Sequence, residues 1–366
     1  MRKPCKLFST FADGVASPLF NVSDRFLLCH STRHVKDPSM FLRSCFVISY
    51  SIFAVSFFLP AAATAFQATA PAGATNATSK TVSGVSTDAA SGLRIICFGA
   101  HPDDAEYKSG GTAALWAASG HHVKMVSVTN GDIGHWNMAG GPLAKRRTAE
   151  STEVARRLGI EYEVLDIHDG ELEPTLENRR LITRLIRRWN ADIVIAHRPW
   201  DYHPDHRYVG VLVQDAAYMV AVPFFCPDTP PLTKNPVFLY SSDRFQKPYP
   251  FRGDIAIAVD EVFDKKVEAL LALESQTFEG GALGSEESAA AAPPASQPEL
   301  RKAWLRERWD RRQAAEARDY RQSLIRWYGA ERGNAVKYAE VFEICEYGRQ
   351  PSEAEIRQLF PFLPKH

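Results

Sequence analysis

The sequence predicts an α/β fold: a Rossmann-like, mostly parallel sheet with helices on both faces. Between Leu93 and Met219, short apolar runs rich in Val and Ile alternate with longer amphipathic segments whose apolar residues recur every three or four positions. Runs that are apolar throughout are typical of parallel strands buried on both faces. Polar turns follow two of these runs, at the edge where open α/β sheets bind their ligands.

Each element of this alternation can be placed on the chain. The short apolar runs predict strands at Arg94–Phe98, Val123–Thr129, Glu163–Ile167, Asp192–Ala196, Val237–Tyr240 and Asp254–Val259. The amphipathic segments predict helices at Thr112–Ser119, Leu143–Leu158, Leu176–Trp189, Arg207–Met219 and Val262–Leu273. The main domain is therefore expected to cover residues 93–279.

Residues 40–65 have the three parts of a secretory signal. A basic start at Arg43 precedes a largely apolar run over 45–59, and Ala63-Thr64-Ala65 forms a small-x-small cleavage site. We therefore expect a signal peptide and a secreted or periplasmic protein. A single membrane anchor formed by 45–59 is the alternative, although this run is shorter than the ~20 residues that a span needs.

The signal peptide also sets the expected boundaries around it. Translation is expected to start near Met40, so that residues 1–39 are not part of the mature protein. Residues 66–92 are rich in Ala, Thr, Ser and Gly, and cannot bury enough apolar surface to order themselves. We expect them to be a disordered linker.

Two segments follow the main domain. Residues 280–298 contain an alanine run and paired prolines, and are expected to be a low-complexity, disordered surface insertion. Residues 299–366 are expected to be a C-terminal helical segment that packs its aromatic residues on the main domain, because acidic residues are interspersed among its arginines. Lys and Arg together number 43, as do Asp and Glu, so no net charge attracts nucleic acid. No sequence signal indicates the oligomeric state.

Two His-Pro-Asp turns mark the expected ligand-binding edge of the sheet. His101-Pro102-Asp103-Asp104 follows the first strand, and His203-Pro204-Asp205-His206 follows the strand that ends at Ala196. A histidine and a carboxylate three residues apart can bind one cation, but a tetrahedral metal then needs a further donor, which the second turn can supply. Acidic residues also stand where a dinucleotide-binding turn has glycines, so a pyrophosphate ligand is not expected.

These two turns resemble the motifs of the LmbE-like (PIG-L) zinc de-N-acetylases. The resemblance continues through Thr129-Asn130-Gly131-Asp132, Arg147 with Glu150, and Asp169-Gly170, and covers roughly residues 93–217. It implies a zinc-dependent deacetylase that hydrolyses a linear amide, with one Zn²⁺ per chain. The implied partner is a small-molecule N-acetylglucosamine-type sugar or glycoconjugate, and no stable membrane span is expected in the mature chain.

The resemblance also implies the centre of the reaction. His101, Asp104 and His206 would bind Zn²⁺ and leave a fourth position for water, as catalytic zinc requires. Asp103 would be the general base, and its alternative is a carboxylate that orients a ligand. His203, when protonated, would stabilise the oxyanion and give a proton to the leaving amine. Alternatively, His101 and Asp104 would only cap the following helix. His203 would then only form a hydrogen bond to the backbone.

Residues further from the metal have implied roles as well. Arg147 and Asp132 would contact the substrate, although Arg147 could equally belong to a solvated helix face. Asp205 would orient His203, although a solvent-facing Asp at the start of a helix fits the sequence equally well. The glycine-rich loop over 130–142 is expected to be a flexible rim, on which Trp136 could stack on a sugar ring; Trp200 is a second candidate for such stacking.

Other functions fit the same residues. A zinc hydrolase of another amide or of an ester would use the same ligands, base and histidine. A non-catalytic sugar-binding protein is a weaker alternative, because it would not need Asp103 and His203 beside a complete set of metal ligands.

Overall fold

The computed structural model describes residues 92–365. The predicted signal peptide at 40–65, the region before it and almost all of the predicted linker at 66–92 lie outside the described residues. Within the described part, no helix is both long enough and apolar enough to cross a bilayer. The alternative membrane anchor at 45–59 also lies outside this range.

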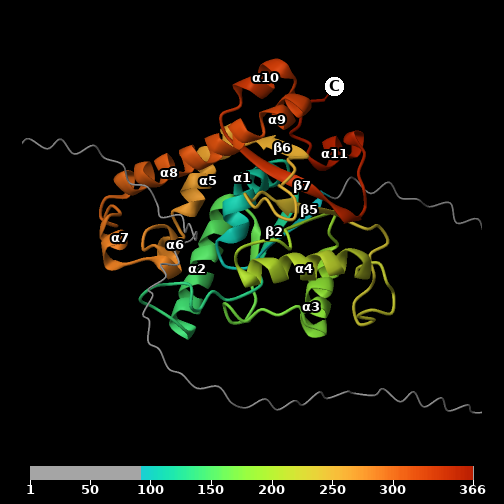
Figure 1. Cartoon of the computed structure of the whole chain (residues 1–366), viewed down its shortest axis with the longest axis horizontal. Coiled ribbons are helices and arrows are strands. Elements are labelled where there is room, and N and C mark those ends of the chain that lie inside the picture. The colour runs from blue at the N-terminus through green and yellow to red at the C-terminus, as the bar shows by residue number, and fades with distance from the viewer. Residues whose placement is uncertain (1–91, 366) are drawn as a thin grey trace, which may run out of the picture. The chain divides into compact units, whose positions relative to one another are not determined.

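A seven-stranded sheet forms the centre of residues 92–365 (Figure 1). Its strand order is β3-β2-β1-β4-β5-β7-β6, and β7 alone runs in the opposite direction to the other strands. The predicted α/β class with a mostly parallel sheet is confirmed. The strands are β1 (Arg94–Gly99), β2 (His122–Ser127), β3 (Glu161–Val164), β4 (Ile193–Ala196), β5 (Val237–Ser241), β6 (Ile255–Ala258) and β7 (Ala339–Gly348).

The helices fall into two groups beside this sheet. Helices α1, α2 and α5 pack on one another, and α3 packs on α4. The chain builds the sheet outward from β1 to β3 and then returns to place β4 on the other side of β1. Because such crossovers are right-handed, this reversal sends α3 and α4 to the opposite face from α1 and α2. These helices are α1 (Asp104–Ala118), α2 (Gly141–Leu158), α3 (Leu176–Trp189), α4 (Pro204–Met219) and α5 (Phe263–Leu270).

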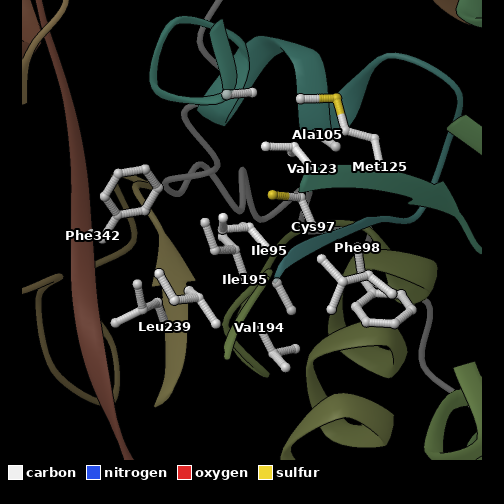
Figure 2. Packing of buried hydrophobic residues seen from close by; sticks show 14 of the residues in the cluster. Ile95, Cys97, Phe98, Ala105, Val123, Met125, Val194, Ile195, Leu239 and Phe342 are labelled. Carbon is white, nitrogen blue, oxygen red and sulfur yellow. The ribbon is translucent and has the colours of Figure 1, made fainter. Parts of the chain in front are cut away.

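The core is densest around the central strands. In β1, Ile95, Ile96 and Cys97 are fully buried, as are Val194 and Ile195 in β4. Figure 2 shows β1 side chains between residues of the neighbouring strands and of α1. Since both faces of β1 and β4 are covered, β4 is apolar throughout and β1 has no charged residue after Arg94, which is why the sequence pattern predicts a parallel sheet.

Helix α1 begins eight residues earlier than the sequence predicts. The pattern places its start at Thr112 because Gly110-Gly111 resembles a helix boundary. Instead these glycines lie inside α1, where they allow β7 to approach closely. A Cβ on Gly111 would lie 2.9 Å from the Glu340 carboxylate oxygen, which accepts a hydrogen bond from the backbone N–H of Gly111. Asp104 is therefore the first residue of the helix, directly beside His101.

The C-terminal part differs from the predicted helical segment. Strand β7 returns into the sheet between β5 and β6, so this part of the chain completes the core. The predicted disordered insertion at 280–298 instead contains two short helical turns, and hydrogen bonds link it to the rim of the cavity described below. The additional helices are α6 (Glu274–Thr277), η2 (Gly281–Leu283), α7 (Glu286–Ala290), α8 (Pro298–Asp319), α9 (Arg321–Tyr328), α10 (Ala330–Ala335) and α11 (Glu353–Leu359), with a 3₁₀ turn η1 (Asp260–Val262) before α5.

Candidate active site

The site lies where the strand order of the sheet reverses. Strands β1 and β4 are parallel neighbours; His101 lies on the turn after β1, and His206 lies in the first turn of α4, the helix that follows β4. A crevice opens at such a reversal because the two following helices leave toward opposite faces. Here it forms a cavity of about 980 Å³, and both histidines line it.

Three atoms of the predicted metal ligands meet in this cavity. His101 Nδ1 lies 3.3 Å from Asp104 Oδ2, which lies 3.3 Å from His206 Nε2. His206 Nε2 is in turn 3.2 Å from His101 Nδ1. A tetrahedral Zn²⁺ with ligand bonds of about 2.0–2.1 Å separates its ligand atoms by about 3.3 Å. The three residues therefore fit one face of such a tetrahedron and would leave its fourth position open.

Carboxylates behind the two histidines determine which ring nitrogens face the centre. His101 Nε2 lies 3.1 Å from Asp169 Oδ1 and 3.2 Å from Asp205 Oδ2. His206 Nδ1 lies 3.1 Å from Asp201 Oδ1. Each ring thus donates its outer N–H to a carboxylate and turns its other nitrogen inward, the arrangement common to metal-binding histidines.

The electrostatics of the site favour positive charge at its centre. Burial alone lowers the pKa of His101, but hydrogen bonds to Asp104, Asp169 and Asp205 outweigh it and raise that pKa well above its usual value. Burial likewise opposes protonation of His206, yet the nearby carboxylates raise its pKa to about 9. Burial raises the pKa of Asp104, but the surrounding histidines outweigh this effect and lower it well below the usual range. A bound divalent cation would supply the positive charge that these groups favour.

Asp103 lies beside this centre and is paired with Arg147. The Arg147 guanidinium is buried, with its Nη2 3.5 Å from Asp103 Oδ1 and its Nη1 3.8 Å from Asp169 Oδ2. Burial raises the pKa of Asp103, and Arg147 opposes that rise without cancelling it. A raised pKa suits a carboxylate that accepts and then returns a proton.

The position of Arg147 contradicts one of its two sequence-based interpretations. It is only 2% exposed, so it does not belong to a solvated helix face. It lines the cavity, as a substrate contact would, but its guanidinium is also held between Asp103 and Asp169. Its position in this structure makes it a residue that orients Asp103.

Asp205 orients a different histidine from the one predicted. Its Oδ2 contacts His101 Nε2, and the same oxygen accepts a 2.7 Å hydrogen bond from the Gly170 N–H. The Asp205 carboxylate thus contacts His101, and only the backbone of Asp205 reaches His203. His203 is held by the backbone, because its Nδ1 accepts from the Asp205 N–H at 3.2 Å. This bond leaves His203 Nε2 as the protonated nitrogen of the neutral ring.

His203 is electrostatically distinct from the other histidines of the cavity. It lines the cavity, and its ring meets that of His101 edge-on with centroids 4.6 Å apart. Burial, together with the positive charge of His101 and His206, lowers the pKa of His203. A lowered pKa favours the neutral ring, which can donate a hydrogen bond from Nε2; the protonated role that the resemblance implies stays a prediction.

The structure contradicts the predicted sugar contact of Asp132. This residue is buried and is not part of the cavity wall. Its Oδ2 lies 2.7 Å from His168 Nδ1, and its Oδ1 accepts from the Asp169 N–H at 3.1 Å. Asp132 thus supports the loop that carries Asp169 against His101.

Sequence reasoning missed His197 and Asp201 as members of the site, and gave Asp169 no role although Asp169-Gly170 belongs to the resemblance. His197 stacks on His206 with ring centroids 4.2 Å apart, and its Nε2 lies 3.4 Å from Asp104 Oδ2. Asp104, His197 and His206 form an alternative group that could hold a cation. The signal for His197 was its position directly after β4, which matches the turn after β1.

The rim of the cavity is tied to the segment that follows α6. The Trp136 N–H donates to the Gly281 carbonyl at 2.9 Å, and its indole N–H donates to the Glu279 carbonyl at 2.8 Å. Glu279 also binds Arg146 and His135. Trp136 and Trp200 do not line the cavity, so neither is placed to stack on a sugar there, whereas the exposed Tyr202 does line it.

Fold and site together have the arrangement of α/β enzymes whose catalytic metal has three protein ligands and one open position. Comparison with known proteins identifies the family. Residues 96–217 match the family described as GlcNAc-PI de-N-acetylase, or PIG-L. A diacetylchitobiose deacetylase of Thermococcus kodakarensis is 30% identical over 189 residues, which are 50% of this chain and 70% of that protein. The chain belongs to the LmbE-like (PIG-L) de-N-acetylase family.

A solved structure and a second sequence relative are also similar to this chain. The N,N′-diacetylchitobiose deacetylase structure from Pyrococcus horikoshii aligns with a TM-score of 0.51 at 24% identity, over 69% of this chain and 83% of that chain. This similarity supports the common fold. A 4-oxalmesaconate hydratase of Pseudomonas putida is 24% identical over 185 residues, 48% of this chain and 71% of that protein. Relatives of this chain therefore carry names for two different reactions.

Proposed function

We propose that this protein is a zinc-dependent hydrolase that removes the N-acetyl group from an N-acetylglucosamine-type sugar or conjugate. The main observation is the triangle of His101 Nδ1, Asp104 Oδ2 and His206 Nε2, with sides of 3.2–3.3 Å. Asp103, a buried carboxylate with a raised pKa, lines the same cavity. The relative named diacetylchitobiose deacetylase supports this reaction over a hydration.

The residues around the centre have complementary roles in amide hydrolysis. When bound, Zn²⁺ supplies Lewis-acid chemistry that favours ionisation of water and polarises a carbonyl. Asp103 accepts a proton from the attacking water as the new C–O bond forms. His203 donates a hydrogen bond from Nε2 to the carbonyl oxygen as negative charge develops on it. As the C–N bond breaks, the proton held by Asp103 passes to the amine, so that the products are acetate and the free amino sugar.

Amine release from a panel of N-acetylated amino sugars tests this proposal. The zinc-loaded protein should release amine, and a chelated sample should not. Asp103→Asn should lower kcat by about 10²–10⁴-fold, the range typical of a lost general base. The same variant should keep its zinc by elemental analysis, whereas His206→Ala should lose it. Bound zinc without amine release across the panel would reject deacetylation and favour another amide, an ester or a hydration.

The location of the protein is a separate proposal. We propose secretion or export to the periplasm, supported by the basic start, apolar run and small-x-small site within residues 40–65. N-terminal sequencing of protein recovered from outside the cytoplasm should begin near Phe66. A mature N-terminus well before this residue would contradict cleavage there.

A further inference from the structure

Helix α8 contains two kinds of basic residue. Arg301, Lys302 and Arg306 each lie within 3.1 Å of a carboxylate from α5 or α6, so their charges are balanced by the main domain. Arg308 and Arg312 have no carboxylate within ion-pair distance among residues 92–365. The paired residues explain how α8 docks, but they do not explain why it carries the other two arginines.

Aromatic rings hold both of these arginines in place. The Arg308 guanidinium carbon lies 3.7 Å from the centroid of Trp304, and that of Arg312 lies 4.8 Å from the centroid of Trp309. Contact with an aromatic face restricts a guanidinium without neutralising its charge or using its in-plane N–H donors. Both side chains are therefore oriented in advance for an anion.

These arginines line the same cavity as the metal ligands. Arg308, Arg311 and Arg312 stand at positions i, i+3 and i+4 of α8, which place them on one face of the helix, and all three border the cavity. Arg311 has only a 3.5 Å contact with Glu307, where both side chains are about 70% exposed and the interaction is screened by solvent. Burial and the neighbouring Arg311 lower the pKa of Arg308, which is consistent with uncompensated positive charge there.

Two acidic groups lie on this side of the cavity, and one of them is neutralised by another arginine. Asp243 is bound by Arg198 at 2.6 Å, whereas Glu316 accepts only a 2.8 Å hydrogen bond from the Ser242 hydroxyl and keeps its charge. Burial lowers the pKa of Lys108, which also lines the cavity. Arg308, Arg311 and Arg312 outnumber Glu316, so the α8 end of the cavity is basic, whereas the His/Asp end is the one proposed to hold the metal.

We infer that the natural substrate carries a phosphate or carboxylate group on the part attached to the amino sugar, and that Arg308, Arg311 and Arg312 bind this anion. The inference rests on the proposed function, which places the acetamide at the His/Asp end. A cavity of about 980 Å³ has room for a ligand that reaches both ends. Guanidinium groups bind both anions through paired N–H donors. Helix α8 lies outside residues 96–217, so this basic wall is separate from the segment that identifies the family.

Substrate pairs that differ only in the anion test this inference. The probes are N-acetylated amino sugars with and without a phosphate, and with and without a carboxylate. Wild-type enzyme should show a higher kcat/KM for an anionic member, mainly through a lower KM. In Arg308→Gln/Arg312→Gln, the ratio of kcat/KM between anionic and neutral members should fall at least about 10-fold, the effect of losing one strong charged contact. Arg306→Gln, which removes a paired arginine from the same helix, should keep the wild-type ratio.

Binding measured without turnover separates this inference from the proposed reaction. Inorganic phosphate is titrated calorimetrically into zinc-loaded wild type, the double variant and Arg306→Gln. Weaker binding in the double variant alone, with zinc and melting temperature retained, would support the anion site even if no sugar is deacetylated. An unchanged ratio of kcat/KM between anionic and neutral substrates, together with unchanged phosphate binding, would overturn the anion site. Amine release from both members of a pair would then show that the deacetylase proposal still stands.

Discussion

Asp201 shows how one carboxylate behind the site can control a ligand in front of it. Its Oδ1 lies 3.1 Å from His206 Nδ1 and also accepts a 3.1 Å hydrogen bond from the His203 N–H. It thereby fixes which nitrogen His206 presents to a metal and holds the turn that carries His203. Burial raises the pKa of Asp201, but its contact with His206 outweighs burial and lowers it, so the side chain is a carboxylate.

Replacing this carboxylate should weaken metal binding without removing a ligand. Asp201→Asn keeps the shape but loses the charge that supports the His206 ring, and such changes typically cost about 10–100-fold in metal affinity. Competition with a chromophoric chelator measures this change. Asp215→Asn, which removes a carboxylate paired with Arg179 on the surface, is the matched control. Equal zinc affinity in both variants would show that Asp201 does not support His206.

Glu279 is one of the residues that join the segment from α6 to η2 to α2 and the rim loop. Its two carboxylate oxygens accept hydrogen bonds of 2.7 and 2.8 Å from Arg146, and one of them lies 2.9 Å from His135 Nε2. The hydrogen bond from Arg146 is the largest cause that lowers the pKa of Glu279 below 4.5. The ionised carboxylate is thus the form that stabilises the folded rim.

Glu279→Gln should lower the free energy of unfolding at pH 7 by about 1–3 kcal/mol, the range for hydrogen bonds to a charged group. The effect should lie toward the lower end of this range, because solvent screens this partly exposed pair. Because the folded-state pKa lies below that of the unfolded chain, this contribution is present above about pH 4.5 and is lost as the pH falls through the folded-state value. Urea unfolding at pH 7 and at successively lower pH should show the two proteins converging. The exposed Glu173→Gln is the control, and a pH-independent difference would argue against an ionic role.

A buried ion pair ties the C-terminal strand β7 to α5, and hydrogen bonds to the same carboxylate tie it to α1. Glu340 of β7 lies 2.7 Å from Lys266 Nζ of α5, and each side chain is only 1% exposed. The same carboxylate accepts from the N–H groups of Gly111 and Thr112 in α1 at 2.8 and 2.7 Å. The hydrogen bonds to α1 join parts of the chain that are more than 200 residues apart, so Glu340 links β7, α5 and α1.

Breaking this pair from one side should destabilise the entire domain. Lys266→Met leaves the Glu340 charge buried without its cation, which typically costs about 3–5 kcal/mol. Lys266→Met/Glu340→Gln removes both charges and should recover part of that loss, so the two changes should not be additive. Thermal and urea unfolding of both singles and the double variant measure the coupling. Additive losses would show that the pair contributes nothing as a pair.

The sequence by itself determined the class of fold and the centre of the site. The alternation of apolar runs and amphipathic segments follows from burial of both faces of β1 and β4, and burial of this kind is visible in local composition. His101 and Asp104 could be paired because three residues on one turn place them side by side. His206 could be added because the ends of parallel strands meet at one edge of a sheet.

Contacts between distant segments were decided only by the tertiary structure. Asp205 binds His101, Asp132 lies behind Asp169, and His197 stacks on His206. Each of these depends on the direction of a side chain leaving a turn, which periodicity does not encode. Periodicity also could not predict the early start of α1, because its glycines allow the close approach of β7. Nor could it predict that the arginines of α8 reach the cavity, because this depends on how a helix 100 residues beyond β4 packs on the sheet. Patterns along a chain report which residues are buried, whereas the folded molecule alone decides what they are buried against.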